Sequence, residues 1–317
     1  MEELPDIVVT NFHRRYTGVS ATVAALLPEQ RKTRSIALID RGGLDLPGNL
    51  SFDAVIRAAR APLASGQPRI WHARRDTEMW AGLYLKHIRR QNWRLLFTSA
   101  APRRHGRVLR TLMGRMDAII ATSERSAGYL DWHSAVIPHG VDTNLFRPAA
   151  SRAAALADIG RSGQNLIGVF GRIRPSKGTD LVVEAVVRLF PAFPTWHAVF
   201  TGLATEHHQE FANGLTRKIA EAGLSDRIQF LGDIAMAEVR QWYQRCHLCV
   251  AASRSEGFGL TPLEAFASGT PALTSEAGAW PWIVTEETGS RFKTGSLESL
   301  AAKLMPLLEH PEKLSAM

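Results

Sequence analysis

Short apolar runs alternate along the whole chain with segments whose apolar residues have helical spacing. The runs are rich in β-branched residues and end at glycine, proline or polar residues, which is typical of strands in a folded core. Strands are expected at residues 6–10, 34–39, 70–73, 94–98, 117–121, 135–137, 166–170, 196–201, 228–231, 247–252 and 271–274. This regular alternation predicts an α/β protein.

Helices are expected between these strands. They are placed at residues 19–27, 52–61, 77–89, 108–116, 179–189, 206–222, 238–245 and 297–308, with another beginning near residue 122. Because proline lacks a backbone donor, Pro28 is expected to follow the end of the first helix and Pro306 to limit the last one. The alanine-rich residues 149–161 are expected to form a linker or a short helix. The length of 317 residues suggests two domains.

The most informative stretch is residues 254–269, Arg-Ser-Glu-Gly-Phe-Gly-Leu-Thr-Pro-Leu-Glu-Ala-Phe-Ala-Ser-Gly, which follows an apolar strand. Thr261 as N-cap, Pro262 at the first helical position and Glu264 form a predicted capping box. Glu256 and Glu264 are separated by seven residues across the turn, so both carboxylates can face one ligand. The alternative is that Glu264 only caps its helix while Glu256 is solvated.

A second glycine loop, Gly-Arg-Ile-Arg-Pro-Ser-Lys-Gly at residues 171–178, joins an expected strand to an expected helix. Arg172 supplies a forked pair of donors, Lys177 a mobile point charge, and the helix N-terminus a partial positive field. Such a loop suits a diphosphate, although it is not a Walker A motif. The alternative is a basic, solvated loop.

The chain has a net charge of +8, so an anionic partner is expected. Nucleic acid, an anionic lipid surface and a phosphorylated substrate all remain open on charge alone. The basic clusters lie in the first half, at residues 14–15, 31–34, 74–75, 89–90 and 103–110. The first half is therefore expected to face the anion.

Two segments of this basic half end a strand with polar side chains. His72, Arg74 and Arg75 follow one strand, and a second group, consisting of Ser99, Arg103, Arg104 and His105, follows the next. Ligands of open α/β sheets collect outside the carboxyl ends of the strands, so an anion site is expected here. The alternative for His72 is an ordinary structural histidine.

Cysteine and hydropathy patterns exclude several classes of protein. Cys246 and Cys249 have the spacing of half a zinc site but no second pair, so they are expected to be core residues of a strand. No metal and no cofactor are expected. Neither a signal peptide nor a bilayer-spanning stretch is visible, and a cytoplasmic protein is expected.

Three motifs, in order, resemble those of retaining glycosyltransferases of family 4. They are Pro-His-Gly-Val-Asp at residues 138–142 with Phe-Arg-Pro after it, the glycine loop at 171–178, and Glu-x7-Glu at 256–264. The resemblance covers nearly the whole chain. It implies the GT-B architecture, two Rossmann-like domains whose parallel sheets face across a cleft. The expected domains are residues 1–148, binding the acceptor, and 149–317, binding the nucleotide sugar.

The resemblance also implies a reaction, transfer of a sugar from a nucleotide diphosphate sugar to a hydroxyl with retention of configuration and without a metal. Arg172 and Lys177 would stabilise the leaving diphosphate and Glu256 would orient the sugar; these are the expected catalytic residues. Glu264 would accept hydrogen bonds from the ribose hydroxyls. The remaining expected donor-binding residues are Gly18, Gly232, Asp233, Gly257, Phe258, Gly259 and Leu260.

The acceptor side follows from a narrower resemblance. Trp-His-Ala-Arg-Arg at 71–75 and Phe-Thr-Ser-Ala-Ala at 97–101 resemble segments of lipopolysaccharide-core mannosyltransferases. This implies GDP-mannose as donor, an anionic glycolipid as acceptor, and a peripheral enzyme at the cytoplasmic face of the inner membrane. Family members often carry a histidine after the second of these strands; Ser99 stands at that place, which leaves the histidine's role unassigned.

Two other functions remain open on the sequence. An epimerase or hydrolase acting on nucleotide sugars would share the fold, and product analysis separates it, because an epimerase needs no acceptor. A nucleic-acid-binding protein is suggested only by charge, without a reading motif or an aromatic platform. In GT-B proteins a terminal helix braces the first domain, so either this end is compact or the natural chain continues beyond Met317.

Overall fold

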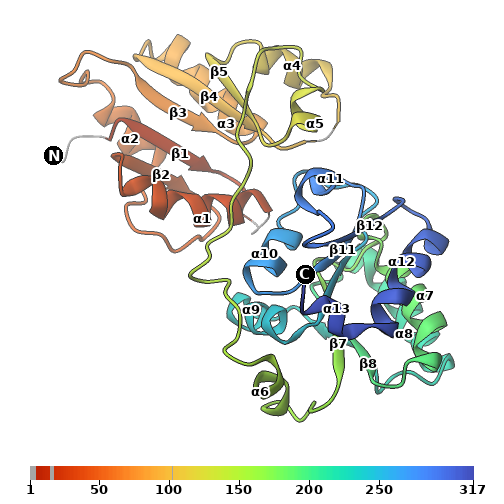
Figure 1. The fold of residues 1–317 in the computed structure, drawn as a ribbon. Helices are drawn as coiled ribbons and strands as arrows, with labels where there is room; N and C mark the ends of the chain where they lie inside the picture. Colours follow the sequence, from red (N-terminus) through yellow and green to blue (C-terminus); the bar gives the residue numbers. More distant parts are fainter. Residues whose placement is uncertain (1–4, 15–17, 102) are drawn as a thin grey trace. The chain divides into compact units, whose positions relative to one another are not determined.

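The computed structural model describes residues 5–14, 18–101 and 103–317, and the chain divides into two compact units, Met1–His139 and Gly140–Met317. Each unit has a six-stranded parallel sheet with helices on both faces, which confirms the α/β prediction (Figure 1). Within the described residues, no helix is both long enough and apolar enough to cross a membrane.

The first unit has the strand order β2-β1-β3-β4-β5-β6. The direction of strand addition reverses between β1 and β3, which leaves a crevice at their carboxyl ends. The strands are β1 (Ile7–Asn11), β2 (Ile36–Asp40), β3 (Arg69–Ala73), β4 (Trp93–Ser99), β5 (Ala118–Ala121) and β6 (Ala135–Val136). The helices are α1 (Gly18–Arg31), α2 (Phe52–Ala58), α3 (Asp76–Leu83), α4 (Arg107–Met113) and α5 (Glu124–Ala127), and a π turn, η1 (Tyr84–Ile88), extends α3.

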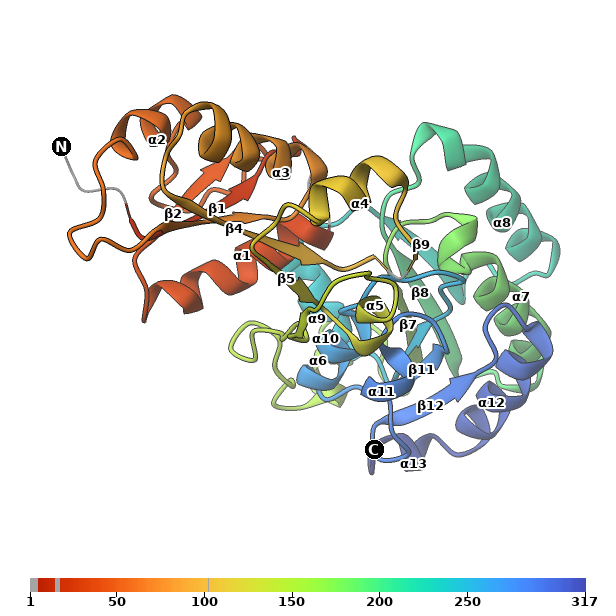
Figure 2. The ribbon, with the colours of Figure 1, turned by 90° about the horizontal axis from the view of Figure 1, so that it is seen from above.

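Two apolar cores lie on opposite faces of this sheet. Helices α2, α3 and α4 cover one face, α1 covers the other, and Figure 2 shows α2 and α3 across the sheet from α1. Trp71 and Trp93 pack edge to face in the larger core, with ring centroids 5.8 Å apart. A Cβ on Gly82 would lie 2.6 Å from the Trp71 ring, so a glycine lets α3 approach the sheet closely.

The second unit has the strand order β12-β11-β10-β7-β8-β9, the order of dinucleotide-binding folds, with the reversal between β7 and β10. Its strands are β7 (Asn165–Phe170), β8 (Trp196–Thr201), β9 (Ile228–Gly232), β10 (Leu248–Ala251), β11 (Ala272–Ser275) and β12 (Gly289–Phe292). Its α-helices are α6 (Arg152–Ala157), α7 (Thr179–Leu189), α8 (Gln209–Glu221), α9 (Met236–Arg245), α10 (Thr261–Ala267), α11 (Trp280–Ile283), α12 (Leu297–Glu309) and α13 (Pro311–Leu314). Short 3₁₀ turns are η2 (Pro175–Lys177), η3 (Phe190–Ala192) and η4 (Glu206–His208).

Helices cover both faces of the second sheet as well. Helices α7, α8 and α12 pack on one face in the largest apolar core, while α6, α9 and α10 pack on the other (Figure 1). Cys246 and Cys249 are free thiols buried in these cores, as expected for core residues of a strand region.

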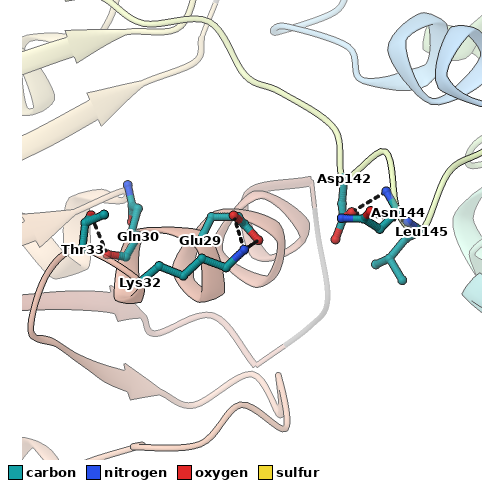
Figure 3. A network of polar contacts seen from close by, with 7 residues as sticks. All are labelled: Glu29, Gln30, Lys32, Thr33, Asp142, Asn144 and Leu145. Carbon is teal, nitrogen blue, oxygen red and sulfur yellow. Dashed lines mark hydrogen bonds and ion pairs between the residues drawn. The ribbon is translucent and has the colours of Figure 1, made fainter.

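Residues 140–148 group with the second unit, whereas the sequence analysis assigned them to the first. Phe146 is buried there and packs edge to face on Tyr243 of α9, with ring centroids 5.8 Å apart. Asp142 holds a turn in this segment, since its Oδ1 accepts the amide N–H of Asn144 at 2.8 Å (Figure 3). This segment therefore packs with the second unit, through Phe146 and Tyr243.

Helix α1 continues through Pro28, which was expected to follow its end, and α12 agrees with the expected range 297–308 to within one residue although it contains Pro306. Helix α1 contains Pro28 and ends at Arg31, whose guanidinium donates to the carbonyl oxygens of Ile36 and Pro47. The ion pair between Lys32 Nζ and Glu29 lies just beyond this proline (Figure 3). Helix α12 contains Pro306 and continues because the residues after it pack on the core. A proline near a helix end removes only one backbone bond, which tertiary contacts offset.

Strand β12 and helix α11 were not predicted. Strand β12 begins at Gly289, where φ is +154° and a Cβ would overlap the carbonyl oxygen of Ala272 on the neighbouring strand. Its four residues are too few to give a pattern of their own, and only the pairing with β11 makes them a strand. Helix α11 is one turn within a segment for which no element was expected.

Candidate active site

A pocket opens at the carboxyl ends of β7 and β10, at the crevice of the second unit. Its lining includes both predicted glycine-loop cations and the start of α10, in particular Gly171, Arg172, Lys177, Ser253, Thr261 and Trp280. The crevice of such a sheet is where ligands of the fold bind. The fold therefore places the loop at residues 171–178 beside the loop at residues 253–260.

Lys177 and Glu256 meet in this crevice. Lys177 Nζ lies 2.5 Å from Glu256 Oε2, and the two side chains are 25% and 16% exposed. Ser253 Oγ donates to the same carboxylate oxygen at 3.2 Å, and the amide N–H of Gly257 donates to Oε1 at 3.2 Å. Two of the three predicted catalytic groups are thus held at one point, from loops far apart in the sequence.

Arg254 joins the two loops, and the sequence analysis assigned it no role. Its Nη1 and Nη2 each lie 2.7 Å from a carboxylate oxygen of Asp180 on α7. Its amide N–H donates to the carbonyl oxygen of Ser176 at 2.9 Å. The hydrogen bonds that Arg254 donates to Asp180 are the main cause of the raised pKa of Arg254. A fork of this kind fixes direction as well as distance, so Arg254 sets the spacing between the loops.

Glycines allow the loop backbones to approach closely. Gly178 has φ of +68°, and a Cβ there would overlap the carbonyl oxygen of Ala252. Gly259 has φ of +84°, and a Cβ there would overlap the indole nitrogen of Trp280, whose N–H donates to the Gly259 carbonyl at 3.0 Å. Trp280 is buried, so it is a packing residue, whereas Trp282 is 46% exposed.

The capping box predicted at the start of α10 is wrong. Leu260 is the N-cap and makes no side-chain cap bond, so Thr261 already lies inside the helix. The Glu264 carboxylate instead accepts the hydroxyl of Tyr243, with Oε2 2.8 Å from the oxygen. Burial raises the pKa of Glu264, while the bond from Tyr243 and the charge of Lys177 oppose that rise. Lys177 therefore acts on both motif glutamates.

The other predicted donor-binding residues lie in the second unit, except Gly18, which belongs to the first. Gly232 ends β9, two strands from β7, and its carbonyl accepts the amide N–H of Gly202 at 2.8 Å. Asp233 follows it and is exposed. Phe258 is buried beneath the loop. Gly18 is the first residue of α1 in the first unit, directly after the undescribed residues 15–17.

The crevice of the first unit collects the residues predicted for the acceptor. His72 is buried on β3, and its Nε2 lies 2.7 Å from Thr98 Oγ1 on β4. Burial, with a smaller effect of Arg74, lowers the pKa of His72 to about 3, so the ring is neutral. This contact with Thr98 is what the alternative interpretation of His72, an ordinary structural histidine, predicts. Arg74 directly follows β3 and its Nη2 donates to Thr22 on α1 at 2.7 Å.

Glu78 ties this crevice together, and no sequence signal marked it. Its side chain is fully buried in the first turn of α3. Oε2 accepts the amide N–H of Arg74 at 2.7 Å and the hydroxyl of Thr10 at 3.0 Å, and Oε1 accepts the amide N–H of Phe12 at 2.9 Å. Burial raises the pKa of Glu78 against the lowering effect of these bonds. One carboxylate thereby joins the ends of β1 and β3.

The segment after β4 brings together two predicted residues. Ser99 ends the strand, and its Oγ lies 3.3 Å from His105 Nε2. Burial and Arg103 lower the pKa of His105. Arg103 and Arg104 are exposed, and Arg104 Nη2 lies 3.6 Å from Asp131. A histidine thus stands beside Ser99 in space although it comes six residues later in the chain.

One further histidine lies near this crevice and was not singled out by itself. Burial lowers the pKa of His139 to about 4, and Arg74 contributes to the same shift. It belongs to the motif at residues 138–142, which entered the sequence analysis only as part of the family resemblance. For metal binding, the described part of the chain contains no group of three or more His, Cys, Asp or Glu side chains suited to hold an ion.

Comparisons with known proteins identify the family. The sequence model described as "Glycosyl transferases group 1" matches residues 154–317. The lipopolysaccharide core biosynthesis mannosyltransferase LpcC of Rhizobium leguminosarum bv. viciae is 45% identical over 309 residues, covering 96% of this chain and 87% of that protein. The lipopolysaccharide core biosynthesis mannosyltransferase LpsB of Rhizobium meliloti (strain 1021) is 38% identical, covering 98% and 89%.

Solved structures agree on the fold. Anabaena Alr3699/HepE, in complex with UDP and glucose, superposes with a TM-score of 0.81 at 20% identity, covering 98% of this chain and 91% of that chain. The C-terminal domain of LpcC from Francisella tularensis, a glycosyl transferase group 1 family protein, is 38% identical with a TM-score of 0.53, covering 56% of this chain and 92% of that one. The chain therefore belongs to the glycosyltransferase group 1 family and is a glycosyltransferase with the GT-B fold.

Proposed function

We propose that this glycosyltransferase moves mannose from GDP-mannose to a hydroxyl of an anionic glycolipid of the lipopolysaccharide core, with retention of configuration. The observation that carries the proposal is the identity of 45% and 38%, over nearly the whole chain, with two lipopolysaccharide core mannosyltransferases. The match extends over both units, so it includes the acceptor side as well as the part matched by the family model.

The donor would lie in the crevice of the second unit. Its diphosphate would take Lys177 as partner in place of Glu256, which would free the Glu256 carboxylate for the sugar hydroxyls. Arg172 lines the same pocket and would bind the second phosphate. Backbone N–H groups of residues 257–260 would complete the diphosphate site. Glu264, oriented by Tyr243, would accept both ribose hydroxyls, and the base would lie over Gly232 and Asp233.

The chemistry follows from where charge develops. The bond between the anomeric carbon and the phosphate oxygen breaks, and the acceptor oxygen bonds to the same carbon from the same face. The acceptor proton passes to a donor phosphate oxygen. Lys177 and Arg172 would stabilise the departing diphosphate, whose charge is larger in the transition state than in the bound donor.

The acceptor would bind at the crevice of the first unit. Arg74 and Arg75 would hold its anionic group, with Ser99, Arg103, Arg104 and His105 on the neighbouring segment. His72, buried against Thr98, would position the end of β3 rather than contact the acceptor. A glycolipid acceptor and the basic first half suit a peripheral enzyme at the cytoplasmic face of the inner membrane.

The test is thermal stabilisation by a panel of GDP-mannose, UDP-glucose and ADP-glucose, followed by product analysis with a lipopolysaccharide core acceptor. A ligand of the native state raises the melting temperature by mass action, so we expect the largest shift with GDP-mannose. Mannosylated acceptor would support the proposal. Free mannose or an altered nucleotide sugar, formed without acceptor, would instead indicate a hydrolase or an epimerase.

A further inference from the structure

The outer face of α3 and η1 carries an exposed apolar stripe. Trp80, Tyr84 and Ile88 are 54%, 40% and 70% exposed, while Met79, Leu83 and Leu85 of the same segment are buried against the sheet. Large apolar side chains exposed singly are ordinary, but three in line on one helix indicate a contact surface. The stripe belongs to the helical layer of α2 and α3 in Figure 2.

The π turn keeps this stripe straight. Residues four apart in an α-helix drift around the axis, so Ile88 would turn away from the line through Trp80 and Tyr84. In η1 the amide N–H of Arg89 bonds to the carbonyl oxygen of Tyr84, five residues back, at 3.0 Å. Because a π turn holds more than four residues, the four residues from Tyr84 to Ile88 fall short of a full turn, which offsets the α-helical excess between Trp80 and Tyr84.

The surroundings of the stripe are basic. Residues 52–60, 76–90 and 107–115, which include the three helices of this face, contain eight arginines and lysines against three acidic residues, and one of these, Glu78, is buried. Two of the eight, Lys86 and Arg110, are paired with Asp117 and Asp131 outside these segments. Arg89 and Arg90 are exposed directly after the stripe. The basic residues are Arg57, Arg60, Lys86, Arg89, Arg90, Arg107, Arg110 and Arg115.

We propose that Trp80, Tyr84 and Ile88, with Arg89 and Arg90, form a docking surface for an anionic lipid bilayer. Tryptophan and tyrosine favour the level of the lipid headgroups, and an isoleucine reaches the acyl region. The arginines match the negative potential of anionic lipids. The proposal deepens the proposed function, since it names the surface that would bring the enzyme to a glycolipid acceptor. So small an apolar surface gives weak, reversible binding.

The experiment is sedimentation of the full chain with vesicles of equal parts phosphatidylcholine and phosphatidylglycerol, and with phosphatidylcholine alone. We expect binding to the anionic vesicles that weakens with salt. The double variant Trp80→Ala/Ile88→Ala is expected to lower partitioning about tenfold, from the apolar area lost. Arg89→Gln/Arg90→Gln is expected to lower it about tenfold on anionic vesicles only.

Matched controls come from the second unit. Leu203→Ala/Met236→Ala removes two apolar side chains of similar exposure, and Arg188→Gln/Arg240→Gln removes two charges. Both controls are expected to bind vesicles as the unaltered chain does. Melting temperature, and its rise with a nucleotide sugar, would show that each variant is folded.

Three results would overturn the proposal: no binding of the unaltered chain to anionic vesicles, equal binding of the stripe variants, or self-association that the stripe variants abolish. The last would make this face a contact between copies of the chain. Transfer to a lipid-free core acceptor is measured separately. If transfer persists without vesicle binding, only the docking surface is wrong; if vesicle binding persists without transfer, only the proposed function is wrong.

Discussion

The two units place polar residues at the same kind of crevice and hold them differently. In the second unit, Lys177 and Glu256 form a partly exposed ion pair, and Arg254 and Asp180 join the loops at the surface. In the first unit, the central carboxylate, Glu78, is fully buried and accepts two backbone amides and a hydroxyl. The crevice of the second unit is built from side-chain pairs between loops, and that of the first unit is built around the buried carboxylate of Glu78.

This difference separates groups that can change partners from groups that cannot. The Lys177 and Glu256 side chains are 25% and 16% exposed, so a ligand can reach the pair and we expect a phosphate to replace Glu256 as the partner of Lys177. A buried carboxylate that loses its hydrogen-bond donors strongly destabilises the fold. Glu78 is therefore expected to keep these partners when a ligand binds. We therefore expect substitutions at the second crevice to affect transfer and those inside the first to affect stability.

The largest effect is expected from Lys177→Ala. Loss of a positive group at the departing diphosphate should lower kcat by about 100- to 1000-fold, as for other preorganised groups at a developing charge. The melting temperature should change little, because the side chain is partly exposed. Lys218→Ala, which removes an exposed lysine paired with Glu184, is the matched control and should leave kcat unchanged. Near-normal turnover of Lys177→Ala would remove this lysine from the site.

Glu264→Gln is expected to follow, with transfer lowered about 100-fold through weaker donor binding. Glutamine can still accept the Tyr243 hydroxyl, but it keeps only one acceptor oxygen and loses the charge that acts on charged and hydroxyl ligands. The readout is the rise in melting temperature caused by a nucleotide sugar, which should shrink. Glu238→Gln, which replaces an exposed residue of α9, is the control. An unchanged rise would show that the ribose is not bound here.

Gly178→Ala tests the close approach of the two loops. Gly178 and Gly223 share φ of +68°, but only at Gly178 would a Cβ overlap a neighbouring backbone, the carbonyl of Ala252. Gly223→Ala should lose about 1 kcal/mol from backbone strain alone. The free energy of unfolding of Gly178→Ala, measured with denaturant, should fall by about 2 kcal/mol more, because the added Cβ forces the loop to shift. Equal losses would mean that the loops adjust freely, which would weaken the contrast with the first unit.

The smallest effect is expected from the pH dependence of stability in the first unit. Because the folded-state pKa of His72 is lowered to about 3, below its unfolded value of 6.5, its contribution is present above pH 6.5 and is lost as pH falls toward 3. Burial raises the pKa of Glu78, so that group acts in the opposite direction, and the comparison must be between variants. His72→Gln should reduce the loss of unfolding free energy between pH 6.5 and 4 by about 2 kcal/mol.

The control for this measurement is His87→Gln, which replaces an exposed histidine of η1. In this variant the free energy of unfolding should depend on pH as it does in the unaltered chain. If His72→Gln kept that dependence too, His72 would not be a buried neutral residue, and the first crevice would be more open than its geometry indicates.

Local pattern predicted most of the fold. The strand–helix alternation, the residues of α7 and the glycine loop at 171–178 follow from properties of neighbouring residues: β-branched runs, helical spacing, and glycine where φ is positive. The continuation of α1 past Pro28 and the strand β12 were missed because packing of distant segments overrides local preference there. Residues 140–148 group with the second unit, where Phe146 is buried against Tyr243.

What the sequence by itself determined is the order of chemistry along the chain: two glycine loops with basic and acidic residues, and basic strand ends in the first half. Only the tertiary structure decided which of these groups meet. Glu256 lies 79 residues from Lys177, Arg254 lies 74 from Asp180, and Glu78 lies 68 from Thr10. Such pairs depend on strand order, because a parallel sheet brings the ends of non-consecutive strands to one edge, and no spacing in the sequence encodes that order.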